Sequence, residues 1–255
     1  NSDVVNTIKQ EYGNVDLLTA SNMFAHSDFL EEITNNVFDV LTEKGTFVIE
    51  VQYLLDTLRD LTFDNIYHEH VNYWSVTSLT TFFKRLGFCV VDVEHIDTHG
   101  GSIRVYVERD STNKTQNVES FIQDESGYGL DDINCYDTFA ERVSTAKETF
   151  LRNIQEIKDR GETIAGYGSP AKATTTLNYF GVTSKDISYI IEDNDLKWNK
   201  YLPGVIIPIK PKEFDTLPDN IIIMAWNYAK EIKNNNTELI DNGVTFTNIK
   251  DLQNG

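Results

Sequence analysis

The sequence predicts an α/β protein built in two unequal parts, and three observations support this prediction. Short β-branched apolar runs alternate with segments of helical periodicity over residues 1–110. A long amphipathic segment follows within residues 111–160. Residues 161–255 alternate again, and begin with a strand that leads directly into a glycine turn. We therefore expect an α/β domain, then a linker with a long helix, then a small second α/β domain.

The first part has the order strand, helix, strand, helix, strand, strand. The expected strands are 15–20, 46–51, 88–94 and 102–108, and the expected helices are 29–41 and 77–86. The last two strands are joined by a loop that contains His99-Gly100-Gly101. This loop is too short for a parallel crossover, so the two strands should pair antiparallel. A parallel sheet with an antiparallel last strand is typical of the C-terminal half of a class I methyltransferase sheet, and we expect that arrangement here.

The second part begins with a polar, glycine-containing stretch, 111 to about 130, which we expect to be a linker. A long helix should then run to Gly161, because apolar residues recur at helical spacing from Phe139 to Ile157. A Rossmann-like domain is expected after it, with strands at 163–166, 187–192, 221–225 and 244–249, and with a helix at 170–179.

Composition excludes several classes of function. Lys plus Arg total 22 against 40 for Asp plus Glu, a formal charge of −18, which opposes binding to nucleic acid or anionic membrane. No apolar run approaches the roughly 20 residues of a membrane span, and the N-terminal residues lack signal-peptide character. The two cysteines cannot form a four-cysteine zinc site or a disulfide framework. We expect a cytoplasmic protein.

The densest polar constellation is Tyr67-His68-Glu69-His70, set among aromatic and apolar residues. A histidine titrates near neutrality, a neighbouring carboxylate can orient it, and a tyrosine hydroxyl can hold a carbonyl oxygen as charge develops there. The motif therefore suits proton abstraction next to a carbonyl. A polar surface loop explains the same spacing. A metal site lacks an obvious third ligand, so we expect no metal here.

Further candidates follow the predicted strands, because ligands of open α/β sheets bind outside the carboxyl ends of the strands. Ala20, Ser21, Asn22 and His26 come after the first strand. His99 follows the third, and Arg104 lies in the fourth, where it could grip a phosphate or carboxylate or lie on a solvated face. His95 has no cluster of candidate residues around it in the sequence, so we expect it to have a structural role.

In the second domain, Gly166-Tyr167-Gly168-Ser169-Pro170-Ala171-Lys172 forms a strand-to-helix turn. Its glycines, the helix N-terminus and Lys172 could bind an anion, although the motif lacks both the third glycine of the dinucleotide fingerprint and the ending of the P-loop. Asp193 stands where an acid often binds a ribose hydroxyl, and a simple turn explains it equally well. Lys197 and Tyr201 lie on the same loop.

Five ordered motifs resemble the sugar C-methyltransferase family: FDNIYHEHVNYWS, THGGSIRVYVER, GYGSPAKATTTLNYFG, EDNDLKWNKYLPG and MAWNYAKEI. Members of that family use S-adenosylmethionine to methylate C3 of a nucleotide-linked 4-keto-deoxysugar. They consist of an N-terminal zinc module, a methyltransferase domain and a C-terminal Rossmann-like domain. The resemblance extends over essentially the whole chain.

The resemblance implies specific roles for residues of this chain. His70 corresponds to the general base that removes the C3 proton, and Glu69, Tyr67 and His26 correspond to residues that orient the base and the sugar. It assigns one wall of the cofactor pocket to Ala20, Ser21 and Asn22. Substrate contacts are expected from His99, Arg104, Lys172, Asp193, Lys197 and Tyr201.

This sequence departs from the family at its start. It has no cysteine cluster, no glycine-rich first methyltransferase strand and no acid after the second. The resemblance therefore implies a truncated or C-terminal portion of such an enzyme, with zinc expected only in the absent module. Two alternatives stay open, a non-catalytic module that binds a nucleotide or nucleotide-sugar, and a sugar methyltransferase acting on oxygen or another position. A homodimer also stays open.

Overall fold

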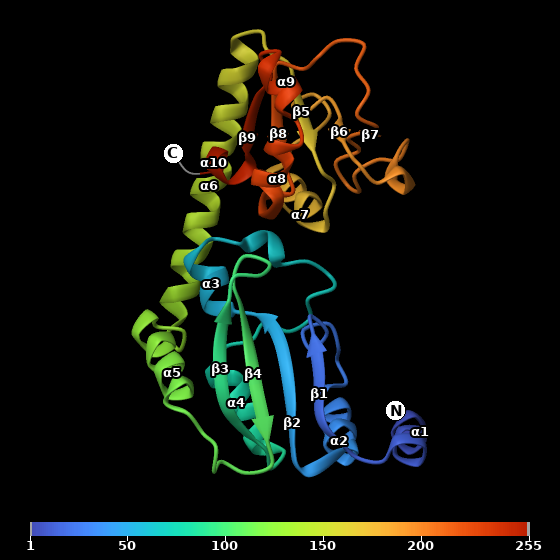
Figure 1. Cartoon of the computed structure of the whole chain (residues 1–255). Coiled ribbons are helices and arrows are strands. Elements are labelled where there is room, and N and C mark those ends of the chain that lie inside the picture. Colours follow the sequence, from blue (N-terminus) through green and yellow to red (C-terminus); the bar gives the residue numbers. More distant parts are fainter. Residues whose placement is uncertain (1, 254–255) are drawn as a thin grey trace. The chain divides into compact units, whose positions relative to one another are not determined.

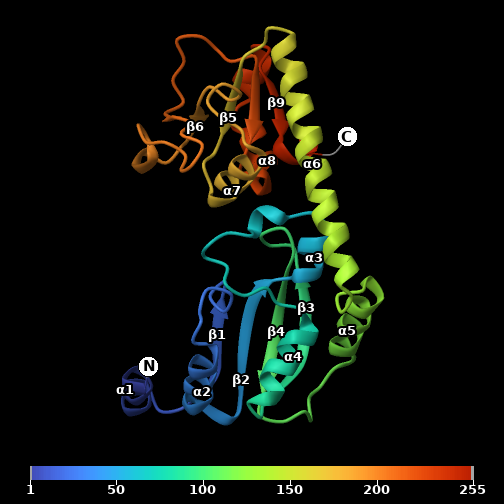
Figure 2. The same cartoon turned by 180° about the vertical axis from the view of Figure 1, so that it is seen from behind.

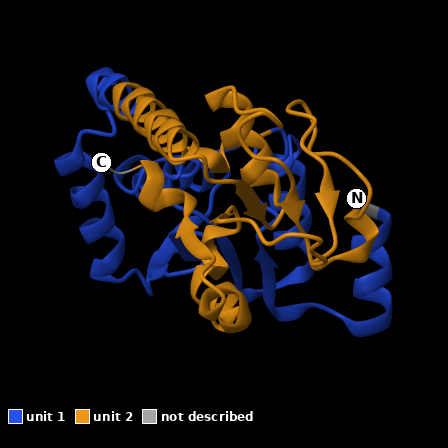
Figure 3. Cartoon of the chain, turned by 90° about the horizontal axis from the view of Figure 1, so that it is seen from above, with its two compact units in different colours: residues 1–62, 68–139 blue, residues 63–67, 140–255 orange. Residues whose placement is uncertain are grey.

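The structure is a computed structural model that describes residues 2–253. The chain divides into two compact units (Figure 3). Unit 1 comprises residues 1–62 and 68–139, and unit 2 comprises residues 63–67 and 140–255. The short segment 63–67 therefore belongs to unit 2, although it is flanked in the sequence by residues of unit 1.

Unit 1 contains a sheet of strands β1 (Val15–Ser21), β2 (Leu41–Gln52), β4 (Ser102–Glu108) and β3 (Cys89–Ile96), in that spatial order (Figure 1). Strands β1 and β2 pair in parallel, whereas β4 pairs antiparallel with both β2 and β3. The predicted antiparallel last strand is confirmed, and it lies between its two neighbours. The fold class predicted from sequence is therefore correct for this unit.

Alternation along the strands separates a buried face from a polar one. The buried face carries Phe47, Ile49 and Val51 of β2, and they share one apolar cluster with Val105 of β4. Helices α2 (Leu30–Val40) and α4 (Val76–Arg85) contribute to the same cluster. Helix α4 starts at Ser75, whose side chain forms a reciprocal capping box with Ser78. The other helices within the first 62 residues are α1 (Ser2–Tyr12) and α3 (Leu54–Arg59).

One prediction for this region is wrong. Residues 111–130 contain helix α5 (Gln116–Tyr128) rather than only a linker. Val118 is fully buried and Phe121 and Ile122 pack against the core of unit 1, an apolar spacing of three and four residues that fits a helix. Glu125 lies one turn further on the same side and is 1% exposed.

Helix α6 (Ile133–Asp159) starts in unit 1 and has most of its length in unit 2. Unit 2 contains a parallel sheet of the order β7-β6-β5-β8-β9 (Figure 1), of which β6, β5 and β9 are also labelled from behind in Figure 2. Its strands are β5 (Ile164–Tyr167), β6 (Ile190–Ile191), β7 (Ile209–Lys210), β8 (Asn220–Ile223) and β9 (Thr245–Asn248). Its other helices are α7 (Ala171–Phe180), α8 (Ala229–Asn234), α9 (Thr237–Asp241) and α10 (Ile249–Gln253).

The order of the strands in unit 2 fixes where its loops converge. From β5 the chain moves outward to β6 and β7, and then returns to the other side of β5 to form β8 and β9. The strand order therefore reverses between β5 and β8, which is where open α/β sheets form a crevice at their carboxyl ends. The predicted Rossmann-like arrangement is present, although the strand expected at 187–192 is limited to Ile190–Ile191.

Candidate active site

The carboxyl end of β1 presents small and polar residues. Ala20 is 8% exposed, whereas Ser21 and Asn22 are exposed. Asn22 has a left-handed backbone with φ of 53°, and its N–H donates to the carbonyl of Glu50 at 2.9 Å. Since Glu50 belongs to the neighbouring strand β2, this bond fixes the turn against the sheet. The side-chain amide of Asn22 lies 3.4 Å from Nε2 of His99.

His26 and His70 come together in unit 1. Their ring centroids are 4.8 Å apart, and His70 is 9% exposed while His26 is exposed. The backbone N–H groups of Val71 and Asn72 both donate to the carbonyl of Ala25, at 3.0 and 3.1 Å. The loop that carries His70 is therefore bonded directly to the loop that carries His26.

The remaining residues of the Tyr67–His70 motif are more accessible. The Glu69 carboxylate lies 4.0 Å from Nε2 of His68, with both side chains largely in solvent. Glu69 is thus next to His68 in this structure, whereas it was expected to orient His70. Tyr67 is half-buried and belongs to unit 2.

The loop between β3 and β4 is fixed by a buried carboxylate. Asp56 of α3 is 4% exposed, and its Oδ2 lies 2.7 Å from Nε2 of His95. Burial raises the pKa of Asp56, against the opposing effect of His95. Gly101, with φ of +104°, packs so tightly here that a Cβ would lie 2.3 Å from Asp56 Oδ2. This contact holds the loop that carries His99, which itself has a positive φ of 56°.

Arg104 is enclosed by carboxylates on the polar face of the sheet. Its Nε donates to Glu50 at 2.7 Å, and its Nη1 lies 3.5 Å from Glu94. The hydrogen bond to Glu50 is the largest cause of a raised pKa at Arg104. Any anionic ligand of Arg104 would have to compete with these two acids.

In unit 2, an internal carboxylate occupies the turn between β5 and α7. Glu192 accepts hydrogen bonds from the backbone N–H of Ser169 at 2.9 Å, from the Ser169 hydroxyl, and from Lys197 Nζ at 3.2 Å. Burial of Glu192 is outweighed by these donors, so its pKa is lowered. Lys197 also donates to the Ser169 carbonyl at 3.1 Å.

The other candidates of unit 2 flank this turn. Asp193 accepts a hydrogen bond from the Tyr167 hydroxyl at 2.8 Å, and burial is the largest cause of the rise in the pKa of Tyr167 to about 12. Tyr201 is 60% exposed and pairs through its backbone with Pro208. Both residues are exposed, but the Asp193 carboxylate already accepts a hydrogen bond from Tyr167.

Lys172 lies in a cluster that the sequence did not indicate. Its Nζ is 4.6 Å from the ring centroid of Trp226, and Lys250 Nζ is 5.2 Å from the same centroid. Trp226 Nε1 donates to Oδ2 of Asp64 at 2.5 Å. Burial lowers the pKa of Lys172, opposed by Asp64 and reinforced by Lys250.

A model of the C-methyltransferase C-terminal domain matches residues 97–249. The chain belongs to the C-methyltransferase C-terminal domain family. It is also 34% identical over 249 residues to the C-methyltransferase NovU of Streptomyces niveus, an alignment that covers 96% of this chain and 59% of that relative. The chain therefore spans about three-fifths of its relative's length, and matches the C-terminal part of it.

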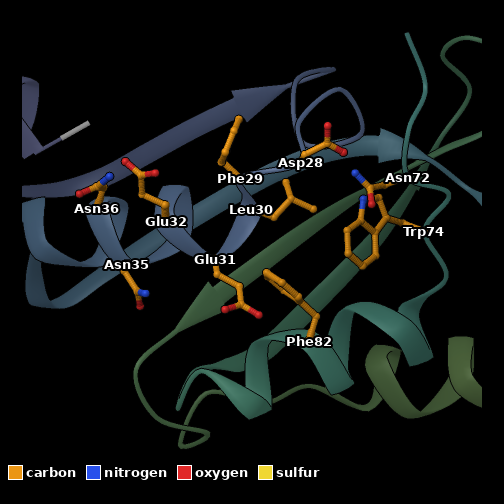
Figure 4. A pocket seen from close by; sticks show the side chains of 10 residues that line it. All are labelled: Asp28, Phe29, Leu30, Glu31, Glu32, Asn35, Asn36, Asn72, Trp74 and Phe82. Carbon is orange, nitrogen blue, oxygen red and sulfur yellow. The ribbon is translucent and has the colours of Figure 1, made fainter. Parts of the chain in front are cut away.

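A pocket of about 730 Å³ lies in unit 1 of this C-methyltransferase family member, between α2 and α4 (Figure 4). Its lining is Asp28, Phe29, Leu30, Glu31, Glu32, Asn35, Asn36, Asn72, Trp74 and Phe82. No residue predicted from sequence to bind substrate or cofactor is part of that lining. Within residues 2–253, no group of three or more His, Cys, Asp or Glu side chains could hold a metal, and no helix is long and apolar enough to span a membrane.

Sequence reasoning missed three polar residues that organise these C-methyltransferase units, namely Asp56, Asp64 and Trp226. Asp64 and Trp226 lie within motifs that carry the family resemblance, FDNIYHEHVNYWS and MAWNYAKEI, and this was a usable signal. Asp56 gave none, because its partner His95 is 39 residues away in the sequence.

Proposed function

We propose that this chain takes part in S-adenosylmethionine-dependent methylation of C3 in a nucleotide-linked 4-keto-deoxysugar, with His70 as the general base. The observation that carries the proposal is the juxtaposition of His70 and His26 beside the carboxyl end of β1, with ring centroids 4.8 Å apart. Membership of a C-methyltransferase family supports carbon as the methyl acceptor.

A carbon nucleophile has no lone pair, so the C–H bond beside the C4 ketone must be broken first. His70 would take the C3 proton on a ring nitrogen while the bonding electrons move toward the carbonyl oxygen. Its low exposure limits competition from water, and the hydrogen bonds from Val71 and Asn72 to Ala25 restrict its loop. His26, exposed at the same place, would orient the keto-sugar. Tyr67 and Glu69 are proposed as supporting groups.

The residues at the carboxyl end of β1 are proposed as one wall of a nucleoside cofactor site. Ser21 and Asn22, which carry a hydroxyl and an amide, are exposed at the carboxyl end of β1, and the small side chain of Ala20 precedes them. When bound, S-adenosylmethionine supplies a methyl group made electrophilic by its sulfonium. The protein residues' own contribution is to bind and orient these molecules and to move the proton.

Contacts to the nucleotide-sugar are proposed for both units separately. In unit 1 they involve His99, beside Asn22, and Arg104, whose guanidinium is already paired with Glu50. In unit 2 they involve Lys172, Asp193, Lys197 and Tyr201, around the carboxyl ends of β5 and β6. The strand-order reversal beside β5 supports a ligand crevice at that end of the sheet.

The test is exchange of the C3 proton of a 4-keto-deoxysugar nucleotide with deuterated water in the whole protein. His70→Ala should reduce the exchange rate by about 10²–10⁴-fold, the usual loss when a positioned acid–base group is removed. His68→Ala is the matched control, because this neighbouring imidazole side chain is 86% exposed. Normal exchange in His70→Ala would refute the role of His70.

A non-catalytic nucleotide-binding module is a second candidate, favoured by the reversal of strand order in unit 2. Calorimetry of this chain separates the two candidates. Binding of S-adenosylmethionine near micromolar affinity supports the enzyme, whereas binding of a nucleotide or nucleotide-sugar alone supports the module.

A further inference from the structure

We propose that Asp64 and Trp226 are positioning residues that anchor the start of the His70 segment in unit 2. This inference rests on the proposed function, since it assigns these residues a role in placing the general base. It gives the C-terminal unit a task that is separate from binding substrate.

Residues 63–67 belong to a different unit from their sequence neighbours. They are part of unit 2, although residues on both sides of them in the sequence are part of unit 1. Phe63 is 5% exposed, and its ring centroid lies 5.6 Å from that of Phe180 and 6.1 Å from that of Tyr179, both in α7. An apolar side chain therefore inserts this short segment into unit 2.

The residue after Phe63 is a buried carboxylate, Asp64. Asp64 is 2% exposed, and burying a carboxylate is costly unless it is well paired. Trp226 Nε1 donates to its Oδ2 at 2.5 Å, and Lys250 Nζ lies 3.7 Å from its Oδ1. Lys250 and Lys172 lie over the ring of the same Trp226. The hydrogen bond from Trp226 is directional, so this buried carboxylate specifies one placement of the segment, which apolar packing of Phe63 alone does not.

The segment that carries His70 is also bonded at its C-terminal end. His70 follows Asp64 by six residues, and Val71 and Asn72 immediately after it both donate to the Ala25 carbonyl. The segment is thus bonded at Asp64 within unit 2 and at Val71 and Asn72 within unit 1. These bonds restrict the backbone on each side of His70 locally, and a general base needs a restricted position for efficient proton transfer.

Trp226→Phe is the sharpest variant, because it removes the indole N–H donor and keeps an aromatic ring for Lys172 and Lys250. Trp198→Phe is the matched control. Trp198 Nε1 also donates within unit 2, to the Glu192 carbonyl at 2.6 Å, but it has no part in segment 63–67. Asp64→Asn serves as a second variant, since it keeps an acceptor for Trp226 and removes the charge.

The first readout is amide hydrogen exchange of residues 64–72 in this chain. Trp226→Phe should accelerate it by about 10- to 100-fold, as expected for the loss of one hydrogen bond to a charged group, whereas Trp198→Phe should not. The double variant with Asp64→Asn should exchange no faster than the more strongly affected single variant. Unchanged exchange in both Trp226→Phe and Asp64→Asn would overturn the anchor.

The second readout is catalytic, in the whole protein. Trp226→Phe should lower kcat and C3 proton exchange in parallel, with KM for S-adenosylmethionine unchanged. Faster amide exchange with normal kcat would overturn the positioning role. The proposed function itself is tested by a different variant, because normal C3 exchange in His70→Ala would refute it. Failure of the positioning role can therefore be distinguished from failure of the proposed function.

Discussion

The imidazole rings of His26 and His70 lie with their centroids 4.8 Å apart and their planes inclined by 55°. One ring follows β1 and the other precedes α4, so the pair exists only in the folded chain. The exposed member can meet a ligand while the buried member is restricted by its loop.

This arrangement predicts unequal roles for the two histidines. His26→Ala should lower the rate of C3 proton exchange by about 10²-fold, the lower end of the range for acid–base groups, because it removes orientation but leaves the base. KM for the keto-sugar should rise as well. The measurement is steady-state kinetics with a 4-keto-deoxysugar nucleotide, and wild-type kinetics in His26→Ala would contradict the assignment.

Gly101 predicts a steric effect on stability. Gly101→Ala places a methyl group 2.3 Å from the Asp56 carboxylate at a φ of +104°. The free energy of unfolding should fall by about 2–4 kcal/mol, from left-handed strain together with overpacking. Gly87→Ala is the control, since its φ is +84° but no atom lies within 4 Å of the added Cβ. Equal losses for the two variants in urea titrations would refute the contact with Asp56.

Glu125 predicts that α5 stabilises the start of α4. Its carboxylate accepts hydrogen bonds from the backbone N–H groups of Val76 and Thr77, at 2.5 and 2.9 Å, and from Tyr53 Oη at 3.0 Å. Glu125→Gln should reduce the free energy of unfolding by about 1–3 kcal/mol, because the amide replaces an acceptor with a donor.

The control for Glu125 is Glu119→Gln on the same helix. Glu119 pairs with Lys114 and its side chain is 58% exposed, so its loss should stay within about 0.5 kcal/mol. Thermal or urea unfolding checks both variants. A loss in Glu125→Gln no greater than that in Glu119→Gln would count against the bond network.

Glu192 predicts a pH dependence of stability. Its pKa in the folded protein is lowered, because donors from Ser169, Asn194 and Lys197 outweigh the effect of burial. The stabilisation is therefore present above the unfolded pKa of about 4.3 and is lost as pH falls through the lower, folded value. Urea unfolding of the wild type between pH 5 and pH 3 should show this loss, and Glu192→Gln should show a smaller one.

Glu148→Gln provides the comparison for that experiment, because Glu148 is exposed on α6 of the same unit. The loss of this one exposed carboxylate should not reproduce the effect of Glu192→Gln. If the free energy of unfolding of Glu192→Gln fell with pH as steeply as that of the wild type, the Ser169 and Lys197 contacts would not stabilise the charged carboxylate.

Much of the sheet could be predicted because its signals are local. The short connection between β3 and β4 excludes a parallel crossover, so their antiparallel pairing follows from loop length. Helix α5 was missed because its apolar residues are few, at Val118, Phe121 and Ile122, and its polar composition suggested a linker. The stability of α5 depends on its packing against the core of unit 1, and the local sequence pattern indicates that packing only weakly.

The residues of the candidate site could also be predicted only where their signals are local. The Tyr67–His70 motif and the strand-end residues Ala20 to Asn22 were identifiable, since residue type and position relative to a strand are local properties. The partners of Glu69 and Arg104 were not, because cross-strand neighbours and loop geometry decide them. Whether these residues act as proposed stays a prediction.

By itself, the sequence determined the α/β class, the antiparallel last strand and the resemblance to C-methyltransferases, because periodicity, loop length and ordered motifs are written along the chain. Only the tertiary structure decided that His70 meets His26, that Asp56 binds His95 and that Asp64 binds Trp226. The last pair is separated by 162 residues. Such contacts arise when burial brings distant segments together and makes an unpaired polar group costly, and no local pattern encodes which partner satisfies it.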